Sequence, residues 1–594
     1  MKYRNITTWN EDSKTPELLY FVQLLEEMLF DFSLDTYKPS VMNASLLCLE
    51  AIETINQIEE GNIKTPNIYH VVEELAACLE KDVVAQTMLP IEHSIFYPDL
   101  KNKKTPIKEL KNVLELLSVN LYLDKYLEKN KQLLCQAILE KNSFSDIRRL
   151  TRTLITSLVS IDYNQKFILN ECINFFYSNK NRIESISDVE AFLSKFDCKT
   201  QSFTIIFRVD QIFEHTAKAI EKLSVKITRE IPQDIDLSKF NSFKSHNNNK
   251  LFAIISDIKA FDVYTARERA EYMLKLISTT LGLFHHKESP NWTSECIVHS
   301  IDNNISIKLA KPINSMHKCA DLKPMVASKK LTNFITSFSL DRDSFNKFFR
   351  SAELHSMALA SNTDENQILN LWIALESLIP SETKGDDVSN IEHITASLIP
   401  FLNMDYIESL LNNLVKDLLR WNSLLTRKTL KNIPAKKIHH KLAKLLVCNE
   451  YASELNTLES SFNDYHLLKD RVELFKVLLS SPKNITTALD AHKVRLEWQI
   501  RRIYRARNII VHSGNTPDYI RPLIEHSHNY LDIVLTKLVD LASNNKTIYT
   551  VGQGFKLVSL QYNTYLKKLG EKNLAFTNDN LETLLFCYSS NKTL

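Results

Sequence analysis

A short segment near the C-terminal end, RIYRARNIIVHSGN (502–515), brings three side chains suited to phosphate chemistry close together in the sequence. Arg507 can hold a phosphate through parallel N–H donors, Asn508 can donate or accept a hydrogen bond, and the imidazole of His512 can move protons near neutral pH. On a helical wheel Arg507 lies in the middle of an apolar sector. The other members of that sector are Leu496, Ile500, Ile503, Ile510 and Val511. An unpaired guanidinium is costly to bury, so Arg507 must meet an acidic partner, an anionic ligand or a water-filled cleft.

His512 follows Arg507 by five residues, which on a continuous helix separates the two side chains by about 140°. They converge only if the helix loosens after Val511. The segment SGNTP (513–517) provides such an ending, with Gly514 as a left-handed cap. The negative end of the helix dipole also favours a protonated imidazole at His512, which suits it to act as an acid.

A second charge on an apolar stripe occurs upstream, in LNLWIALESLIP (369–380). Glu376 shares its helix face with Leu369, Trp372 and Ile373. Two opposite charges on the apolar faces of neighbouring helices predict a Glu376–Arg507 ion pair that fixes the guanidinium. The alternative is a carboxylate at a helix end that reaches solvent.

Two of these stretches carry a family resemblance. RNIIVH fits the R-x4-6-H motif of the HEPN superfamily, and LWIALESL together with RIYRARNIIVHSG resembles the Apea-like HEPN branch of prokaryotic anti-phage proteins. The resemblance covers roughly residues 340–545. It implies a helical bundle with metal-independent endoribonuclease activity, in which Arg507, Asn508 and His512 are catalytic and no cofactor is needed. It also implies a homodimer in which two motifs face one cleft, with an interface through the 488–512 helix.

In such an enzyme the 2′-OH of RNA attacks the adjacent phosphorus and leaves a 2′,3′-cyclic phosphate, with His512 transferring protons and Arg507 holding the phosphate oxygens. We expect a toxic effector in anti-phage defence or abortive infection, which the region before residue 340 restrains or activates on a phage-derived trigger. One alternative is a catalytically inactive HEPN module that dimerises or binds RNA. Another is a helical scaffold with no nucleic-acid role.

Basic residues near the motif are candidates for binding RNA, with a tRNA among the possible targets. Arg501 and Arg505 lie on the same side of their helix as Asn508 and His512. The stretch RKTLKNIPAKKIHHKLAK (427–444) has seven Lys or Arg residues and no acid, a pattern typical of a tract that follows a phosphate backbone. From it we select Lys436, Lys437 and Lys441. The alternative is a solvated basic face.

Metal and nucleotide sites are not expected. The 9 cysteines form no CxxC pair, which argues against a zinc site or a disulfide framework. The histidine pairs His285–His286, His439–His440 and His526/His528 lack acidic or cysteine neighbours at ligand spacing and are predicted to lie on the surface. With only 7 glycines, the chain has no phosphate-binding loop, and VGQGF (551–555) is predicted to be a turn.

The elements that position these residues are expected to be mostly helical, because so few glycines allow few tight turns and hairpins. Short β-branched segments predict strands at 201–209, 250–258 and 294–312, with an amphipathic helix between the second and the third. Towards the C-terminus, helices are predicted at about 404–425, 437–447, 465–480, 488–512 and 518–542.

The length of 594 residues predicts two or three domains. We expect a helical N-terminal region (1–198), an α+β region (199–339), a HEPN nuclease domain (340–545) and a C-terminal extension (546–594). The net charge of +2 restricts any nucleic-acid binding to a local patch. No apolar run reaches the length of a membrane span, so a cytoplasmic protein without membrane contact is expected.

Overall fold

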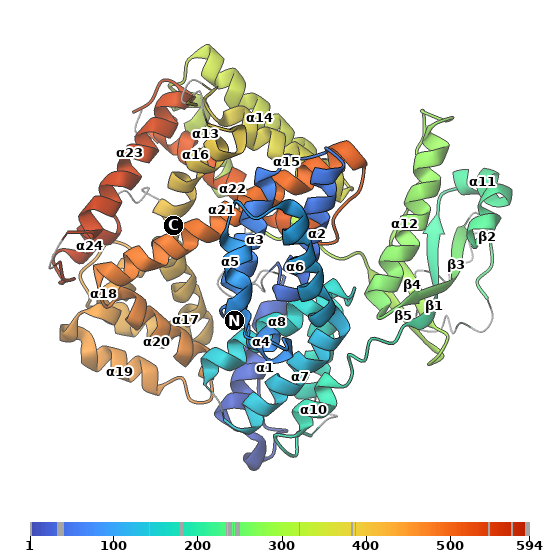
Figure 1. Cartoon of the computed structure of the whole chain (residues 1–594), viewed down its shortest axis with the longest axis horizontal. Helices are drawn as coiled ribbons and strands as arrows, with labels where there is room; N and C mark the ends of the chain where they lie inside the picture. Colours follow the sequence, from blue (N-terminus) through green and yellow to red (C-terminus); the bar gives the residue numbers. More distant parts are fainter. Residues whose placement is uncertain are drawn as a thin grey trace. The chain divides into compact units, whose positions relative to one another are not determined.

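The computed structural model describes most of the chain (Figure 1). The described residues are 3–31, 41–141, 143–178, 182–232, 235, 240, 243, 250–319, 321–381, 384–385, 388–544, 547–571 and 574–587. They are mostly α-helical, with one small antiparallel sheet. The predicted fold class, mostly α with a small α+β region, is confirmed. Within these ranges no helix is both long and apolar enough to span a bilayer.

The chain forms two compact units, and the division differs from the predicted one. The larger unit consists of Met1–Asn5, Lys14–Thr153 and Asn314–Leu594, and the smaller of Ile6–Ser13 and Leu154–Ile313. The N-terminal helices therefore share a unit with the C-terminal helices instead of forming a region with the sheet. The sheet-bearing unit is inserted between the two helical parts of the larger one.

The smaller unit is built on a five-stranded antiparallel sheet with the order β2-β3-β1-β4-β5. The chain order β1-α11-β2-β3-α12-β4 is that of the split βαβ arrangement, and β5 extends one edge. Helix α12 packs against β1, β3 and β4 (Figure 1). The elements are α9 (Gln165–Phe176), α10 (Asp188–Leu193), β1 (Gln201–Val209), α11 (Ile212–Ile220), β2 (Val225–Thr228), β3 (Leu251–Ala260), α12 (Val263–Gly282), β4 (Trp292–Ser300) and β5 (Ile305–Ala310).

Alternation along the strands gives the sheet two apolar faces. Phe203, Ile205 and Phe207 of β1 join the core beneath α12, whereas Ile206 belongs to a second cluster on the opposite face. The segment predicted as one strand at 294–312 is a hairpin, because the chain turns between β4 and β5. β2 was missed, since four residues are too few to show a periodicity.

The first part of the larger unit is a set of helices that precede the inserted unit. Thr15 and Asn43 cap the first two of them by accepting hydrogen bonds from backbone amides. These helices are α1 (Pro16–Leu29), α2 (Ala44–Glu59), α3 (Pro66–Leu79), α4 (Val83–Met88), α5 (Tyr97–Lys101), α6 (Ile107–Asn120), α7 (Leu123–Leu139) and α8 (Phe144–Ser160), the last of which continues into the smaller unit.

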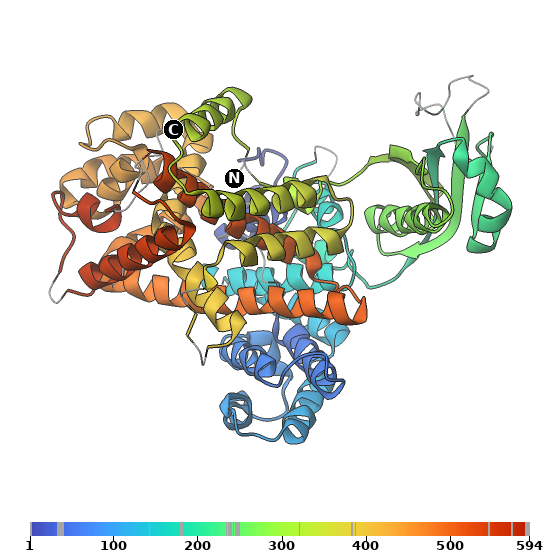
Figure 2. The same ribbon diagram turned by 90° about the horizontal axis from the view of Figure 1, so that it is seen from above.

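The second part of the larger unit surrounds one long helix, α21, which contacts α3, α15, α16, α20, α22 and α23. Figure 2 shows it as the long orange helix. The helices of this part are α13 (Pro324–Ser337), α14 (Arg342–Ala360), α15 (Asp364–Leu378), α16 (Asn390–Met404), α17 (Tyr406–Leu430), α18 (Ile438–Val447), α19 (Ala452–Ser460), α20 (His466–Leu479), α21 (Pro482–Ser513), α22 (Ile520–Val539), α23 (Val551–Leu569) and α24 (Leu581–Leu585).

The predicted turn at VGQGF is wrong, because these residues form the first turns of α23. Thr550 and Gln553 form a capping box at its start. A Cβ atom at Gly554 would meet the Leu538 side chain at 2.6 Å, so this glycine allows α23 to approach α22 closely. Of the predicted C-terminal extension, residues 588–594 lie outside the described part.

Candidate functional site

The candidate site lies at the C-terminal end of α21, whose two ends carry clear signals. Ser481 accepts a hydrogen bond from the Asn484 amide at the start, next to Pro482 in the first helical position. At the other end Gly514 has a φ of +70°, and its amide donates to the Ile510 carbonyl at 3.1 Å. The predicted left-handed cap at Gly514 is confirmed.

Arg507 and Asn508 lie side by side near this end. Arg507 is half-buried, and its Nη1 donates to Oδ1 of the buried Asn508 at 3.0 Å. The Nε atom of Arg507 is buried and has no hydrogen-bond partner among the described residues. A buried donor without a partner costs about 1–3 kcal/mol. Asn508 therefore orients the guanidinium of Arg507, while the Nε–H donor of Arg507 stays available.

The position of His512 differs from the prediction. Helix α21 continues through His512 to Ser513 and does not loosen after Val511. His512 is exposed, and Val511, expected in the buried sector, is 49% exposed. With five residues between them on an unbroken helix, the side chains of Arg507 and His512 leave the axis about 140° apart. They do not converge within one chain.

The loop after His512 is tied to the N-terminal end of α15. Thr516 Oγ1 donates to Glu365 Oε1 at 2.7 Å, and Arg521 Nε donates to Asp364 Oδ2 at 3.2 Å. These contacts hold the segment between α21 and α22, and with it the exposed end of α21 that carries His512.

The predicted ion pair between Glu376 and Arg507 is not formed in the described structure, and Glu376 is exposed. Contacts of Thr516 with Glu365 and of Tyr504 with Trp372 show that α15 and α21 run antiparallel. Trp372 and Tyr504 mark a level at which the two helices meet. Glu376 lies four residues beyond Trp372, about 6 Å along the axis, and Arg507 lies three residues beyond Tyr504, about 4.5 Å along the axis in the opposite direction. The two charges are too far apart along the axes to meet.

Two other arginines of α21 do have acidic partners. Arg502 Nε donates to both carboxylate oxygens of Glu50 at 3.0 Å, and its Nη2 donates to Glu74 Oε2 at 2.6 Å. Arg505 Nη2 donates to Glu50 Oε1 at 2.7 Å. Glu50 belongs to α2 and Glu74 to α3, so the N-terminal helices are joined to the helix of the motif through a buried ion-pair network.

The charges of this network strongly affect one another. Burial by itself would raise the pKa of the Glu50 carboxyl, but Arg502 and Arg505 outweigh burial and lower it to about 2. Burial raises the pKa of Glu74, and its ion pair with Arg502 opposes that shift only in part. Glu50 therefore stays ionised and is the main counter-charge of the two arginines.

This network corrects the expectation that Arg505 contacts RNA. Arg505 is 2% exposed and paired with Glu50, so its guanidinium faces other helices and not solvent. Arg501 is half-buried, and burial lowers its pKa, with Glu392 and Glu497 raising it. Glu50 itself was missed by sequence reasoning, although its spacing from Leu47 and Thr54 places a charge on the buried face of α2.

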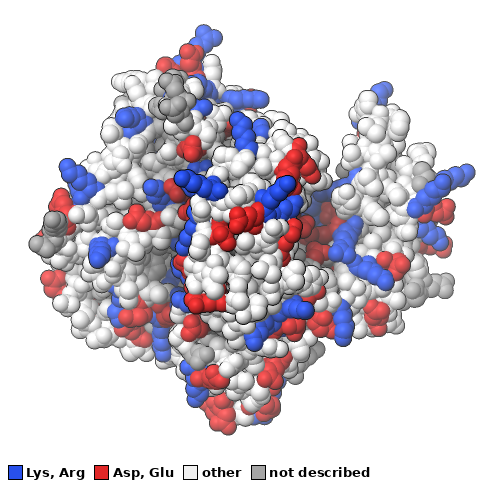
Figure 3. Space-filling model, viewed as in Figure 1, with Lys and Arg blue, Asp and Glu red and all other residues white. Residues whose placement is uncertain are grey.

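Three of the seven Lys and Arg residues of the basic tract at 427–444, which are Lys437, Lys441 and Lys444, have ion-pair or backbone carbonyl partners within the protein. Lys441 Nζ donates to the Leu430 carbonyl at 3.3 Å, and Lys437 pairs with Glu408 at 3.7 Å. Of the three lysines selected for RNA contact, only Lys436 is exposed. The exposed cations of the tract are Arg427, Lys428, Lys431 and Lys436. Figure 3 shows Lys and Arg interspersed with Asp and Glu on the visible face.

Three of the histidines predicted at the surface are buried. His439 and His440 lie inside α18, where His439 Nε2 is 2.8 Å from Glu408 Oε1 and His440 Nδ1 is 2.9 Å from Glu582 Oε2. His528 is buried in α22. Glu408 and Glu582 come from other helices, whereas the acidic neighbour of His528 is Asp532, four residues on in α22. The prediction was therefore wrong for these three histidines. His285 and His286 are exposed as expected.

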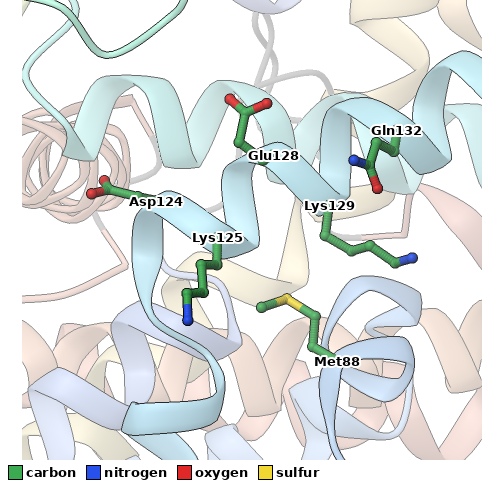
Figure 4. Close-up of a pocket in the computed structure, with 6 residues that line it drawn as sticks. All are labelled: Met88, Asp124, Lys125, Glu128, Lys129 and Gln132. Carbon is green, nitrogen blue, oxygen red and sulfur yellow. The ribbon is translucent and has the colours of Figure 1, made fainter.

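The larger unit also has a surface depression that does not include the motif residues (Figure 4). It is lined by one side of α7 and by Met88 at the end of α4. The α7 residues are Asp124, Lys125, Glu128, Lys129 and Gln132. The lining combines the Met88 side chain with charged side chains of both signs.

Known proteins give no guide to this arrangement. No family model, curated protein or solved structure matches the chain. The residues at the end of α21 are therefore the basis for a proposed function.

Proposed function

We propose that the chain is a metal-independent endoribonuclease of the HEPN type that acts as a toxic effector in anti-phage defence, and that its active site is assembled from two copies. The observation that carries this proposal is the end of α21. There an arginine with a free buried donor, oriented by Asn508, stands five residues before an exposed histidine.

The chemistry needs a proton acceptor, a proton donor and a phosphate clamp. One His512 takes the proton of the 2′-OH as the 2′-oxygen bonds to phosphorus. The bond from phosphorus to the 5′-oxygen breaks, and a protonated His512 gives its proton to that oxygen. Arg507 donates to the non-bridging oxygens, whose charge grows in the transition state. The products are a 2′,3′-cyclic phosphate and a 5′-hydroxyl.

One chain supplies one such histidine, and it diverges from its own Arg507. Two helix ends facing each other provide two histidines and two arginines. The expected interface along the 488–512 helix needs revision, because Leu496, Ile500, Ile503 and most residues up to Ile510 are buried within the chain. The exposed stretch is Val511–Asn515. We therefore place the dimer contact around the end of α21 instead of along its length.

The N-terminal helices are suited to restrain such a site. Glu50 binds Arg502 and Arg505, and Glu74 binds Arg502. These arginines lie five and two residues before Arg507 on the same helix. A trigger that displaced α2 or α3 would alter the position of α21. This contact supports the proposed role of the N-terminal region in restraint and sensing.

The test is cleavage of total RNA by purified protein, compared with Arg507→Ala and His512→Ala. We expect each variant to lose about 10²–10³-fold in rate, while Lys493→Ala, an exposed cation on the same helix, retains activity. Fragments should end in a 2′,3′-cyclic phosphate. Light scattering should show a dimer, and specific activity should fall on dilution. Equal cleavage by all variants would reject the assignment.

The second candidate is a HEPN-type module that dimerises or binds RNA without cutting it. The divergence of Arg507 and His512 within one chain favours this alternative if no dimer brings them together. RNA binding by the wild type without any cleavage, and equal binding by His512→Ala, would identify it.

A further inference from the structure

A cluster of metal-ligand side chains lies in the larger unit, away from the motif residues. It consists of His355 on α14 and of His528 and Asp532 on α22. One ligand atom from each residue lies within 4.8 Å of the others. His528 and Asp532 are four residues apart on one helix, so both side chains leave the same face.

The distances fit a shared cation better than they fit hydrogen bonds. His528 Nε2 is 3.5 Å from Asp532 Oδ2, and His355 Nε2 is 3.7 Å from Asp532 Oδ1. Hydrogen bonds between such groups are about 2.7–3.2 Å long. Ligand atoms bound to one zinc ion at about 2.0–2.1 Å in a tetrahedron are about 3.3–3.4 Å apart.

The cluster also has an unused donor atom in a buried place. His355 Nε2 is buried and has no hydrogen-bond partner among the described residues. The His528 side chain is 4% exposed. A buried ring nitrogen without a partner is costly, and a bound cation would satisfy it.

A further acidic side chain, Asp321, follows the short 3-10 helix η5 (Ser315–His317). This helix packs on α14 and α22, and Lys318 pairs with Glu525 of α22 at 3.2 Å. Burial lowers the pKa of His528 while Asp321 raises it, and Asp321 also raises the pKa of Asp532, where burial is the larger cause. The Asp321 carboxylate therefore adds negative charge near the cluster.

A second cluster of the same kind has a different character. Glu408, His439 and His440 also gather ligand atoms, but their carboxylate partners are already neutralised. Lys437 pairs with Glu408 at 3.7 Å, and Lys444 pairs with Glu582 at 2.9 Å. A divalent cation there would be repelled by two ammonium groups, so this cluster is an ion-pair network.

We propose that His355, His528 and Asp532 bind one zinc ion, with a water molecule as the fourth ligand. Two imidazoles and a carboxylate are a donor set that suits zinc among the available divalent metals. The ion joins α14 to α22. It serves the fold, and its ligands include neither Arg507 nor His512, so the inference does not rest on the proposed function.

The test uses full-length protein without an affinity tag. We expect close to one equivalent of zinc by elemental analysis after purification, and one equivalent of Co²⁺ taken up by the stripped protein with the visible absorption of tetrahedral coordination. His355→Ala, His528→Ala and the near-isosteric Asp532→Asn should each weaken metal binding by more than about 100-fold, beyond what loss of an outer partner costs. His526→Ala, on the same helix but outside the cluster, should bind normally.

Circular dichroism of each variant separates loss of metal from loss of fold, and Asp532→Asn is the variant that is expected to fold. Protein that takes up neither metal overturns the proposal. So does retention of the metal by all three ligand variants, or an equal loss in His526→Ala.

Discussion

Arg505 and Arg507 lie two residues apart on α21, yet their surroundings are opposite. Arg505, together with Arg502, is enclosed and paired with Glu50. Arg507 has an amide neighbour, Asn508, and a buried Nε with no partner in the described structure. Arg505 also keeps buried Nε and Nη1 atoms without a hydrogen-bond partner in the described structure. The difference between the two arginines is therefore the carboxylate counter-charge, which Arg505 has and Arg507 lacks among the described residues. The difference shows that a charge on an apolar stripe has a structural role where its counter-charge is supplied, and is a candidate for function where it is not.

The largest expected effect is a loss of stability when Arg502 and Arg505 lose their ion pairs with Glu50. Glu50→Gln leaves Arg502 and Arg505 buried without their main counter-charge. We expect the free energy of unfolding to fall by about 3–5 kcal/mol, measured by urea denaturation. Glu53→Gln, an exposed carboxylate one turn along α2, should change it by less than about 0.5 kcal/mol. Similar stability of the two variants would contradict the assigned role of Glu50.

Exchanging the two arginines for alanine should separate stability from activity. Arg507→Ala is expected to reduce RNA cleavage by about 10²–10³-fold and to change the free energy of unfolding by less than about 1 kcal/mol, because no ion pair is lost. Arg505→Ala should lower stability by more than Arg507→Ala does, since it leaves part of the Glu50 charge without a partner. Paired cleavage and denaturation measurements check this, and a similar loss of stability in both variants would remove the contrast.

The stability that the ion pairs of Glu50 contribute should also depend on pH. Glu50 has a pKa lowered to about 2 in the folded protein, so its stabilising contribution is fully present above the unfolded value near 4.5 and is lost as the pH falls towards 2. The stability gap between wild type and Glu50→Gln should therefore shrink by roughly 3 kcal/mol over that range. Glu74 is common to both proteins, so its titration largely cancels. Denaturation curves between pH 5 and pH 2 would show a constant gap if the ion pairs did not lower this pKa.

The smallest effect is expected at Glu376, which the sequence placed beside Arg507. Because Glu376 is exposed at the far end of α15 from the motif, Glu376→Gln should alter stability by less than about 0.5 kcal/mol and leave cleavage unchanged. A loss of activity comparable to that of Arg507→Ala would mean that the two side chains do interact.

Local signals explain which parts of the structure were predictable. The end of α21 was found because Gly514 marks it, and β1 was found because nine residues show a clear strand pattern. The start of α21 at Pro482, six residues before the predicted position, follows a Ser-Pro signal that was not used. The partners of the arginines could not be found in this way. Glu50 and Arg502 are 452 residues apart, and periodicity indicates only that a side chain is buried, not what it meets.

Distance along the sequence also explains why the cluster of His355, His528 and Asp532 was not predicted. His355 and Asp532 belong to different helices of the larger unit, and a motif search within a short window sees only the HSHNYLD stretch of α22. The four-residue step from His528 to Asp532 was present there as a signal. The third residue of the cluster, His355, lies 173 residues before His528 in the sequence.

The ion pairs between α2, α3 and α21 also set an order of events during protein synthesis. A ribosome makes Glu50 and Glu74 first and Arg502 and Arg505 only after more than 400 further residues, while domains made earlier fold as they emerge. Glu50 and Glu74 must therefore stay hydrated or in other contacts until Arg502 and Arg505 have left the exit tunnel. A chain that stops before Arg502 holds Glu50 on the buried face of α2 without its partners from α21, so its N-terminal helices cannot complete this part of their packing.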